Sequence, residues 1–157
     1  MLFRSEALGY LLGGLGLGAI LVAPWVAGAF GDITPSVVVR ASLPVYAGAI
    51  VAFGLSRSYA FGLLAIVVAG GGFLALIATT NTATQTLVDE HMRGRVLALR
   101  VMAFTGAYPA GGLLQGWLAD VFSPSAVVTA AGLSLFGIWL WARRQTIALA
   151  RLDERPA

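Results

Sequence analysis

Apolar and charged positions alternate along this chain in long blocks. Five windows contain no charged residue, and Arg, Asp or Glu lies next to or near both ends of each: 7–31, 41–55, 58–88, 101–119 and 121–142. A helix needs about 20 apolar residues to cross the roughly 30 Å of hydrocarbon in a bilayer. Each window therefore predicts a transmembrane helix, and the chain as a whole is predicted to be an all-α membrane protein.

The windows also give approximate boundaries for the helices. The predicted spans are Leu8–Phe30, Val37–Leu55, a long third span from about Tyr59, Val96–Ala119 and Ala126–Trp141. The second span crosses the bilayer only if it includes Arg40, whose long side chain would reach back to the interface. We expect residues 1–157 to form a single transmembrane bundle, with a cytoplasmic tail from about residue 143.

Several spans carry glycines at the spacing that allows two helix backbones to approach closely. The small-xxx-small pairs are Gly9/Gly13, Gly14/Gly18 and Gly112/Gly116, and Gly70, Gly71 and Gly72 lie in the middle of the third span. In lipid, such pairs let dispersion replace the missing hydrophobic driving force. They predict tight packing along the first, third and fourth spans.

Composition supports lipid as the main surroundings. Hydrophobic residues make up 59 % of the chain and charged residues 11 %, against about 25 % charged residues in a typical soluble domain. The absence of cysteine excludes disulfides and thiolate metal sites, and a single histidine, His91, excludes a multi-histidine metal site. No acidic residue lies deep in a span. We therefore expect no enzyme activity, no catalytic residues, no metal and no cofactor.

The positive charge comes from arginine alone, and its distribution predicts an orientation. Eight arginines fall on one side of the membrane if the spans alternate: Arg40, Arg93, Arg95, Arg100, Arg143, Arg144, Arg151 and Arg155. Arg4 and Arg57 fall on the other. The positive-inside rule places the N-terminus outside and the C-terminus in the cytoplasm. The use of arginine alone, with abundant alanine, glycine and valine, indicates a bacterial source, so we expect a bacterial inner membrane. The basic charge thus indicates topology rather than nucleic-acid binding.

Polar residues inside the third and fourth spans are the candidates for a substrate path. They are Asn81, Thr84, Gln85, Tyr108 and Gln115. One interpretation is local, because threonine hydroxyls near a helix end bond back to the helix carbonyls. The other is a water-filled path, since Asn81 and Gln85 lie one turn apart on one side of the helix. Seven-residue steps extend that side to Ile77 and Gly70.

The stretch NTATQTLVDEHMRGRVLALRVMAFTGAYPAGGLLQGWLAD, residues 81–120, resembles major facilitator superfamily transporters of the drug- and siderophore-efflux branch. The resemblance rests on the ordered combination of Asn81 and Gln85, an acidic pair, Arg93-Gly94-Arg95, and a Gly/Pro-rich helix that ends at Asp120. Gly31-Asp32 with Arg40 resembles a degenerate form of the family's short cytoplasmic loop.

That resemblance implies the last five of twelve helices of a secondary transporter. The third span would line the substrate cavity, and the first and fourth would face the other half of the transporter. The implied function is efflux of an unknown small molecule, with the bilayer and possibly a chain carrying the missing half as partners. The alternative is a small membrane scaffold or accessory protein, or an inactive fragment.

Within the resemblance, Arg93, Gly94 and Arg95 belong to a cytoplasmic loop between two helices. Two interpretations remain open for the arginines. They hold the ends of the third and fourth spans through Asp89 or Glu90, or they serve only as positive-inside anchors, because exposed ion pairs contribute little.

Overall fold

Five helices account for 93 % of the described residues, and no strand occurs among them. The structure is a computed structural model that describes residues 2–28 and 35–144. The helices are α1 Leu2–Val26, α2 Pro35–Leu55, α3 Tyr59–Leu87, α4 Glu90–Val121 and α5 Pro124–Arg144. Each is long and apolar enough to cross a membrane, which confirms the five predicted spans.

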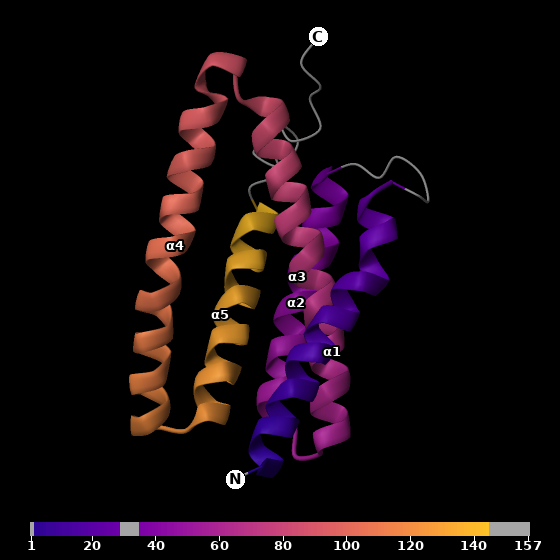
Figure 1. Cartoon of the computed structure of the whole chain (residues 1–157), viewed down its shortest axis with the longest axis vertical. Helices are drawn as coiled ribbons and strands as arrows, with labels where there is room; N and C mark the ends of the chain where they lie inside the picture. The colour runs from indigo at the N-terminus through magenta and orange to yellow at the C-terminus, as the bar shows by residue number, and fades with distance from the viewer. Residues whose placement is uncertain (1, 29–34, 145–157) are drawn as a thin grey trace.

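The helices run up and down in antiparallel sequence (Figure 1). Only residues 56–58, 88–89 and 122–123 join α2 to α3, α3 to α4 and α4 to α5. Links this short force consecutive helices to reverse direction. The starts of α2 and α4 and the end of α5 therefore lie at the same end of the bundle.

Two helices differ most from the boundaries that the charge pattern predicted, the first and the fourth. The first helix begins at Leu2 rather than Leu8 and ends at Val26, and Gly28 follows with a positive φ of 79°. The fourth begins at Glu90 rather than Val96. The amides of Met92 and Arg93 already donate to the carbonyl of Asp89. Charged residues are ordinary helix formers, so charge marked the edge of the apolar span and not the end of the helix.

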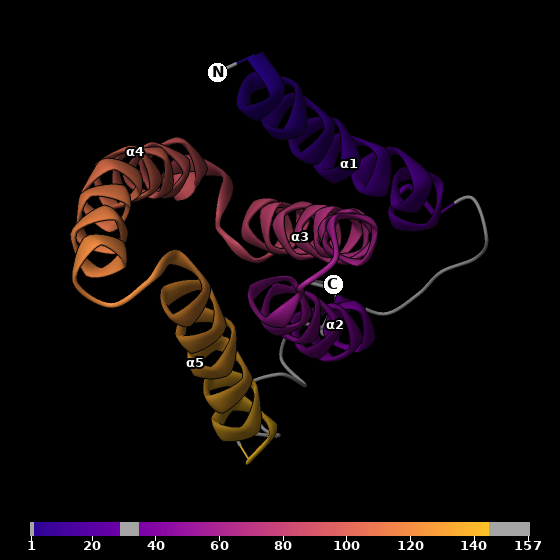
Figure 2. The same ribbon diagram turned by 90° about the horizontal axis from the view of Figure 1, so that it is seen from below.

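The third helix is at the centre of the bundle (Figure 2). It packs along α1 on one side and α2 on another, and α5 packs on the far side of α2. The fourth helix has few contacts with α3 and α5 and bows away from the rest as an arc. Pro109 lies inside this helix, and an internal proline removes a helix hydrogen bond and bends the axis.

Glycines form the contact between α1 and α3. A β-carbon added at Gly18 would collide with the carbonyl of Val67, and one at Gly70 with the carbonyl of Leu15. A β-carbon at Gly14 would lie 2.9 Å from Leu63. The Gly14/Gly18 pair therefore packs against a helix backbone as its spacing predicted. Gly9 and Gly13 have no such neighbour within 4 Å.

A second close contact joins α2 and α5. A β-carbon at Gly132 would lie 2.7 Å from the Val51 side chain and 2.9 Å from the Val51 amide nitrogen. Across the same interface the Ser125 hydroxyl donates to the carbonyl of Gly54. The sequence did not predict this contact, because Gly54 and Gly132 belong to none of the small-xxx-small pairs identified in it.

The fourth helix does not pack through its glycines within this chain. None of its described residues is buried, and Gly112 and Gly116 have no atom of a neighbouring element within 4 Å of an added β-carbon. The same holds for Gly94, Gly106 and Gly111. Within this chain the Gly112/Gly116 pair is therefore not a helix–helix contact.

Basic side chains gather at one end of the bundle. The indole N–H of Trp139 donates to the carbonyl of Arg40 at 3.1 Å, and the guanidinium of Arg143 lies 5.1 Å from the Trp139 ring centroid. These contacts bring the start of α2 and the end of α5 to one level. Arg57, between α2 and α3, lies at the opposite end. The described arginines thus follow the alternation on which the predicted orientation depends.

Candidate functional site

The polar end of α3 contains threonines that bond to their own helix. The Thr80 hydroxyl donates to the carbonyl of Leu76 at 2.7 Å and to that of Ile77 at 3.1 Å. The Thr84 hydroxyl donates to the carbonyl of Thr80, also at 2.7 Å. For Thr80 and Thr84 the local interpretation therefore holds: their hydroxyls bond back to carbonyls of their own helix.

Asn81 is instead engaged by another helix. The Arg100 guanidinium of α4 donates through Nη1 to Asn81 Oδ1 at 2.7 Å and through Nη2 to Thr80 Oγ1 at 3.3 Å. Phe104, one turn further along α4, has its ring centroid 5.7 Å from the Arg100 Cζ. These polar contacts link α4 to α3 across one end of the bundle.

From the sequence, Arg100 was predicted only to be one of the arginines that set the orientation. Ten residues separate it from the start of α4 at Glu90, which is about 15 Å along a helix axis. Its depth in an apolar helix was the available signal, because an arginine in that position needs a polar partner. Asn81 was one candidate, on the helix that precedes it.

The predicted path side of α3 is polar only near its end. Asn81 and Gln85 are both exposed, one helical turn apart. Gly70, which seven-residue steps placed on the same side, packs against the carbonyl of Leu15 in α1. This part of the prediction is wrong in the middle of the bundle, where that side of α3 forms a helix–helix interface.

The two path candidates on α4 lie on its exposed surface. The Tyr108 side chain is 76 % exposed. Gln115 is also exposed, and it lies one turn before Leu118, which faces α5. The structure does not gather Tyr108 and Gln115 with Asn81 into one pocket.

The residues of the predicted cytoplasmic loop lie in helix. Arg93, Gly94 and Arg95 are in the first two turns of α4, and all three are exposed. Among the described residues neither arginine pairs with Asp89 or Glu90. Arg40 lies in α2, and Asp32 is outside the described residues. The assignment of residues 93–95 to a loop is therefore corrected, and an ion-pair role for these arginines has no support among their contacts.

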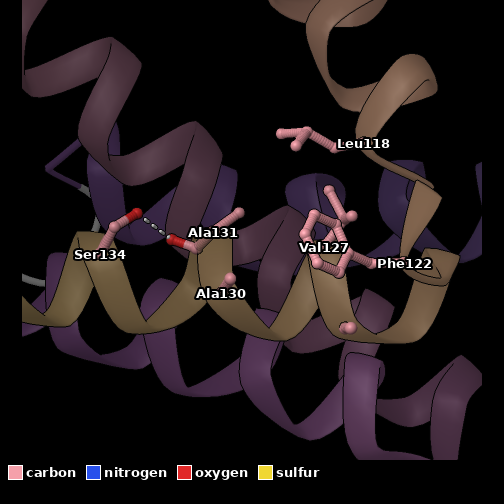
Figure 3. A pocket seen from close by; sticks show the side chains of 7 residues that line it. Leu118, Phe122, Val127, Ala130, Ala131 and Ser134 are labelled. Atoms are coloured by element: carbon pink, nitrogen blue, oxygen red, sulfur yellow. Dashed lines mark hydrogen bonds between the residues drawn. The ribbon is translucent and has the colours of Figure 1, made fainter.

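An apolar groove of about 490 Å³ lies where α4 turns into α5 (Figure 3). Its lining residues are Leu118, Phe122, Ala126, Val127, Ala130, Ala131 and Ser134. The Ser134 hydroxyl donates to the carbonyl of Ala131 at 2.8 Å, as the dashed line in Figure 3 marks. The groove can accept an apolar group, but its one polar side chain is already occupied in its own helix.

This arrangement defines a multi-pass helical membrane protein, with a polar contact between two spans and no deep carboxylate in the described helices. Its sequence matches the family described as transmembrane secretion effectors over residues 4–155. The chain belongs to this family, which is of the major facilitator type. No curated protein and no solved structure matches the chain.

Proposed function

We propose that this chain forms part of an efflux-type secondary transporter and moves a small molecule outward across the bacterial inner membrane. Membership of a transmembrane secretion effector family supports transport as the general function. The observation that carries the finer proposal is the polar contact of Arg100 with Asn81 and Thr80, which closes one end of the α3–α4 pair. Below it, α4 bows away from the centre of the bundle (Figure 2).

Alternating access requires one bundle to move against another around a central site. Arg100, Asn81 and Thr80 form a polar contact at one end of α4, and α4 has few other contacts with the bundle. This contact can break and re-form as α4 moves. We place this end in the cytoplasm, following the arginine distribution and the positive-inside rule. The N-terminus would then lie outside and the C-terminus inside.

The proposal includes further transmembrane helices that pack on α4. A 32-residue apolar helix with no buried residue among those described offers five glycines with no neighbouring element against them. Small residues of this kind are typical of helix interfaces in lipid. We infer that a partner half, from another chain or from a longer form of this one, covers this surface.

Transport can be tested in everted inner-membrane vesicles from a bacterium that produces the chain, either alone or together with the product of any adjacent reading frame that encodes further transmembrane helices. Energised vesicles should accumulate at least one member of a panel of cationic, neutral and anionic lipophilic fluorescent dyes. Vesicles that lack the chain should not. If the chain adds no accumulation of any dye, with or without that product, the accessory-protein interpretation becomes the better one.

The path itself can be tested by cysteine labelling, because the chain has no cysteine of its own. A cysteine at Asn81 or Gln85 should react with a water-soluble maleimide in intact vesicles. Val68, which is 43 % exposed in the middle of α3, provides the control because its exposed surface should meet lipid. Equal labelling at Val68 and Asn81 would remove the support for a water-filled path. An alkaline phosphatase fusion after Ala157 that is active outside would reverse the orientation.

A further inference from the structure

Arg100 is a cation with no anion beside it among the residues that the structure describes. Its contacts are the Asn81 amide oxygen, the Thr80 hydroxyl and the Phe104 ring, and none of these carries a charge. No carboxylate pairs with it among the described residues. An arginine in a transmembrane helix usually pairs with an acid or lies in a wet cavity, because desolvating an unpaired charge is costly.

The guanidinium is also held in a fixed orientation. The Thr80 hydroxyl donates to the Leu76 carbonyl, so its lone pair is directed toward Arg100 Nη2. Asn81 holds Nη1 at 2.7 Å, and Phe104 lies beside the guanidinium, 5.7 Å from Cζ to its ring centroid. These contacts use one N–H on each of two nitrogens. Arginine has five N–H donors in a planar fork, so three remain for a further acceptor.

The site is open, and Arg100 gives it a positive charge. Thr80 and Asn81 are exposed, and Phe104 is 51 % exposed, so a ligand can approach from the side of α4. Arg93 lies seven residues before Arg100, two turns away on the same face of α4, and adds charge of the same sign. Neutral acceptors orient the guanidinium without cancelling its charge, which leaves the attraction for an anion intact.

We propose that Arg100, positioned by Asn81 and Thr80, binds an oxyanion such as a phosphate or carboxylate group at the α3–α4 end of the bundle. Planar, bidentate pairing with the remaining N–H donors suits either group. The oxyanion can belong to a soluble molecule or to the headgroup of an anionic lipid. If it belongs to a transported molecule, the inference rests on the proposed function and makes that substrate an anion.

The test measures binding and needs no transport, so its failure and the failure of the proposed function are distinguishable. The full chain carries Gln85→Cys labelled with bimane, one turn from Asn81, and is placed in phosphatidylcholine nanodiscs. Titration with inorganic phosphate should shift the bimane emission. Arg100→Gln should weaken the apparent affinity about tenfold, because it removes a charge-assisted pair. Arg100→Lys should weaken it less, because it keeps the charge and loses the fork.

Two further variants separate binding from a structural effect. Asn81→Ala breaks the same α3–α4 hydrogen bond as Arg100→Gln but keeps the cation, so it should retain most of the binding. Arg144→Gln removes an exposed charge at the same end of the bundle and should leave binding unchanged. If Asn81→Ala loses as much as Arg100→Gln, or if Arg144→Gln does, the proposal is overturned.

The lipid arm identifies the source of the oxyanion. Phosphatidylglycerol replaces part of the phosphatidylcholine, with no phosphate in the buffer. An emission shift that depends on Arg100 only in these nanodiscs would assign the site to a lipid headgroup. A shift with inorganic phosphate in neutral nanodiscs would assign it to a soluble anion. No shift that depends on Arg100 under either condition would overturn the proposal.

Discussion

The first and fourth helices carry the same glycine pattern in opposite surroundings. Gly14 and Gly18 of α1 meet the side chains and backbone of α3, so that an added β-carbon at Gly18 would collide with a carbonyl. Gly112 and Gly116 of α4 have the same four-residue spacing, and no neighbouring element lies within 4 Å of an added β-carbon. The glycine spacing predicts that another helix can approach this surface closely, but it does not predict which helix does so.

This difference separates the chain into two regions. Helices α1, α2, α3 and α5 pack on one another through backbone contacts at Gly18, Gly54, Gly70 and Gly132. Helix α4 is joined by the Arg100 contacts near one end and by apolar contacts with α5 at the other. The first region should therefore determine the stability of the chain alone, and α4 should matter mainly for what the chain assembles with or transports.

The largest effect is expected at the α1–α3 contact. Gly18→Leu places a side chain where the carbonyl of Val67 lies, so α1 must move away from α3. We expect a loss of about 3 kcal/mol or more in the free energy of unfolding. Unfolding in mixed micelles, with sodium dodecyl sulfate as the denaturant and helicity followed by circular dichroism, measures it. Gly16→Leu is the matched control, because nothing lies within 4 Å there. Equal stability of the two variants would contradict the α1–α3 packing.

The α2–α5 contact should tolerate substitution slightly better. A β-carbon at Gly132 would lie 2.7 Å from the Val51 side chain and 2.9 Å from its amide nitrogen, which is a less severe overlap than that of Gly18 with the Val67 carbonyl. We expect Gly132→Leu to destabilise the chain by about 2 kcal/mol in the same assay. Gly137→Leu, on the same helix with open space around it, should be nearly neutral. A neutral Gly132→Leu would show that α5 does not pack on α2 in this way.

A smaller loss is expected from one hydrogen bond in that interface. Ser125→Ala removes the hydroxyl that donates to the Gly54 carbonyl, and should lower stability by about 1 kcal/mol. Ser134→Ala is the control, because that hydroxyl bonds only within its own helix, to Ala131. If both substitutions have the same small effect, the contact between Ser125 and Gly54 contributes nothing specific to the α2–α5 interface.

The smallest effect on stability is expected on α4, where the comparison is sharpest. Gly112→Leu meets no neighbouring element, so the chain alone should change by less than about 0.5 kcal/mol. Dye accumulation in the vesicles described above should nevertheless fall, because the larger side chain blocks a partner helix. Loss of stability in the isolated chain would show that α4 packs inside this bundle after all. Unchanged transport would show that the Gly112 surface faces lipid.

Much of the fold was predictable because lipid imposes simple rules. A bilayer requires about 20 apolar residues per helix and internal satisfaction of every backbone hydrogen bond, so five uncharged windows could only become five helices. Short polar links fixed their alternating directions. The helix ends were less predictable. The mostly polar segment 90–95 continues α4 beyond the apolar span, and a pattern of apolar residues gives only the limits of the span.

The candidate site was predictable only in part. Asn81 and Gln85 stood out as amides in an apolar span, and both are exposed at the end of α3. The partner of Asn81 did not stand out, because Arg100 was one of ten arginines whose charge already had an explanation in topology. A polar residue in a sequence shows that it needs a partner, while the crossing of two helices selects that partner.

The sequence by itself therefore determined the number of spans, their alternation, the family and the positions that permit close packing. Only the tertiary structure decided which of those positions are used: Gly18 and Gly70 contact another helix, whereas Gly112 and Gly116 do not. The physical reason is that hydrophobicity and backbone hydrogen bonding act within each segment and can be read locally. Helix packing in lipid depends on which surfaces meet, and α1, α3 and α4 become neighbours or remain apart only when the whole bundle is assembled.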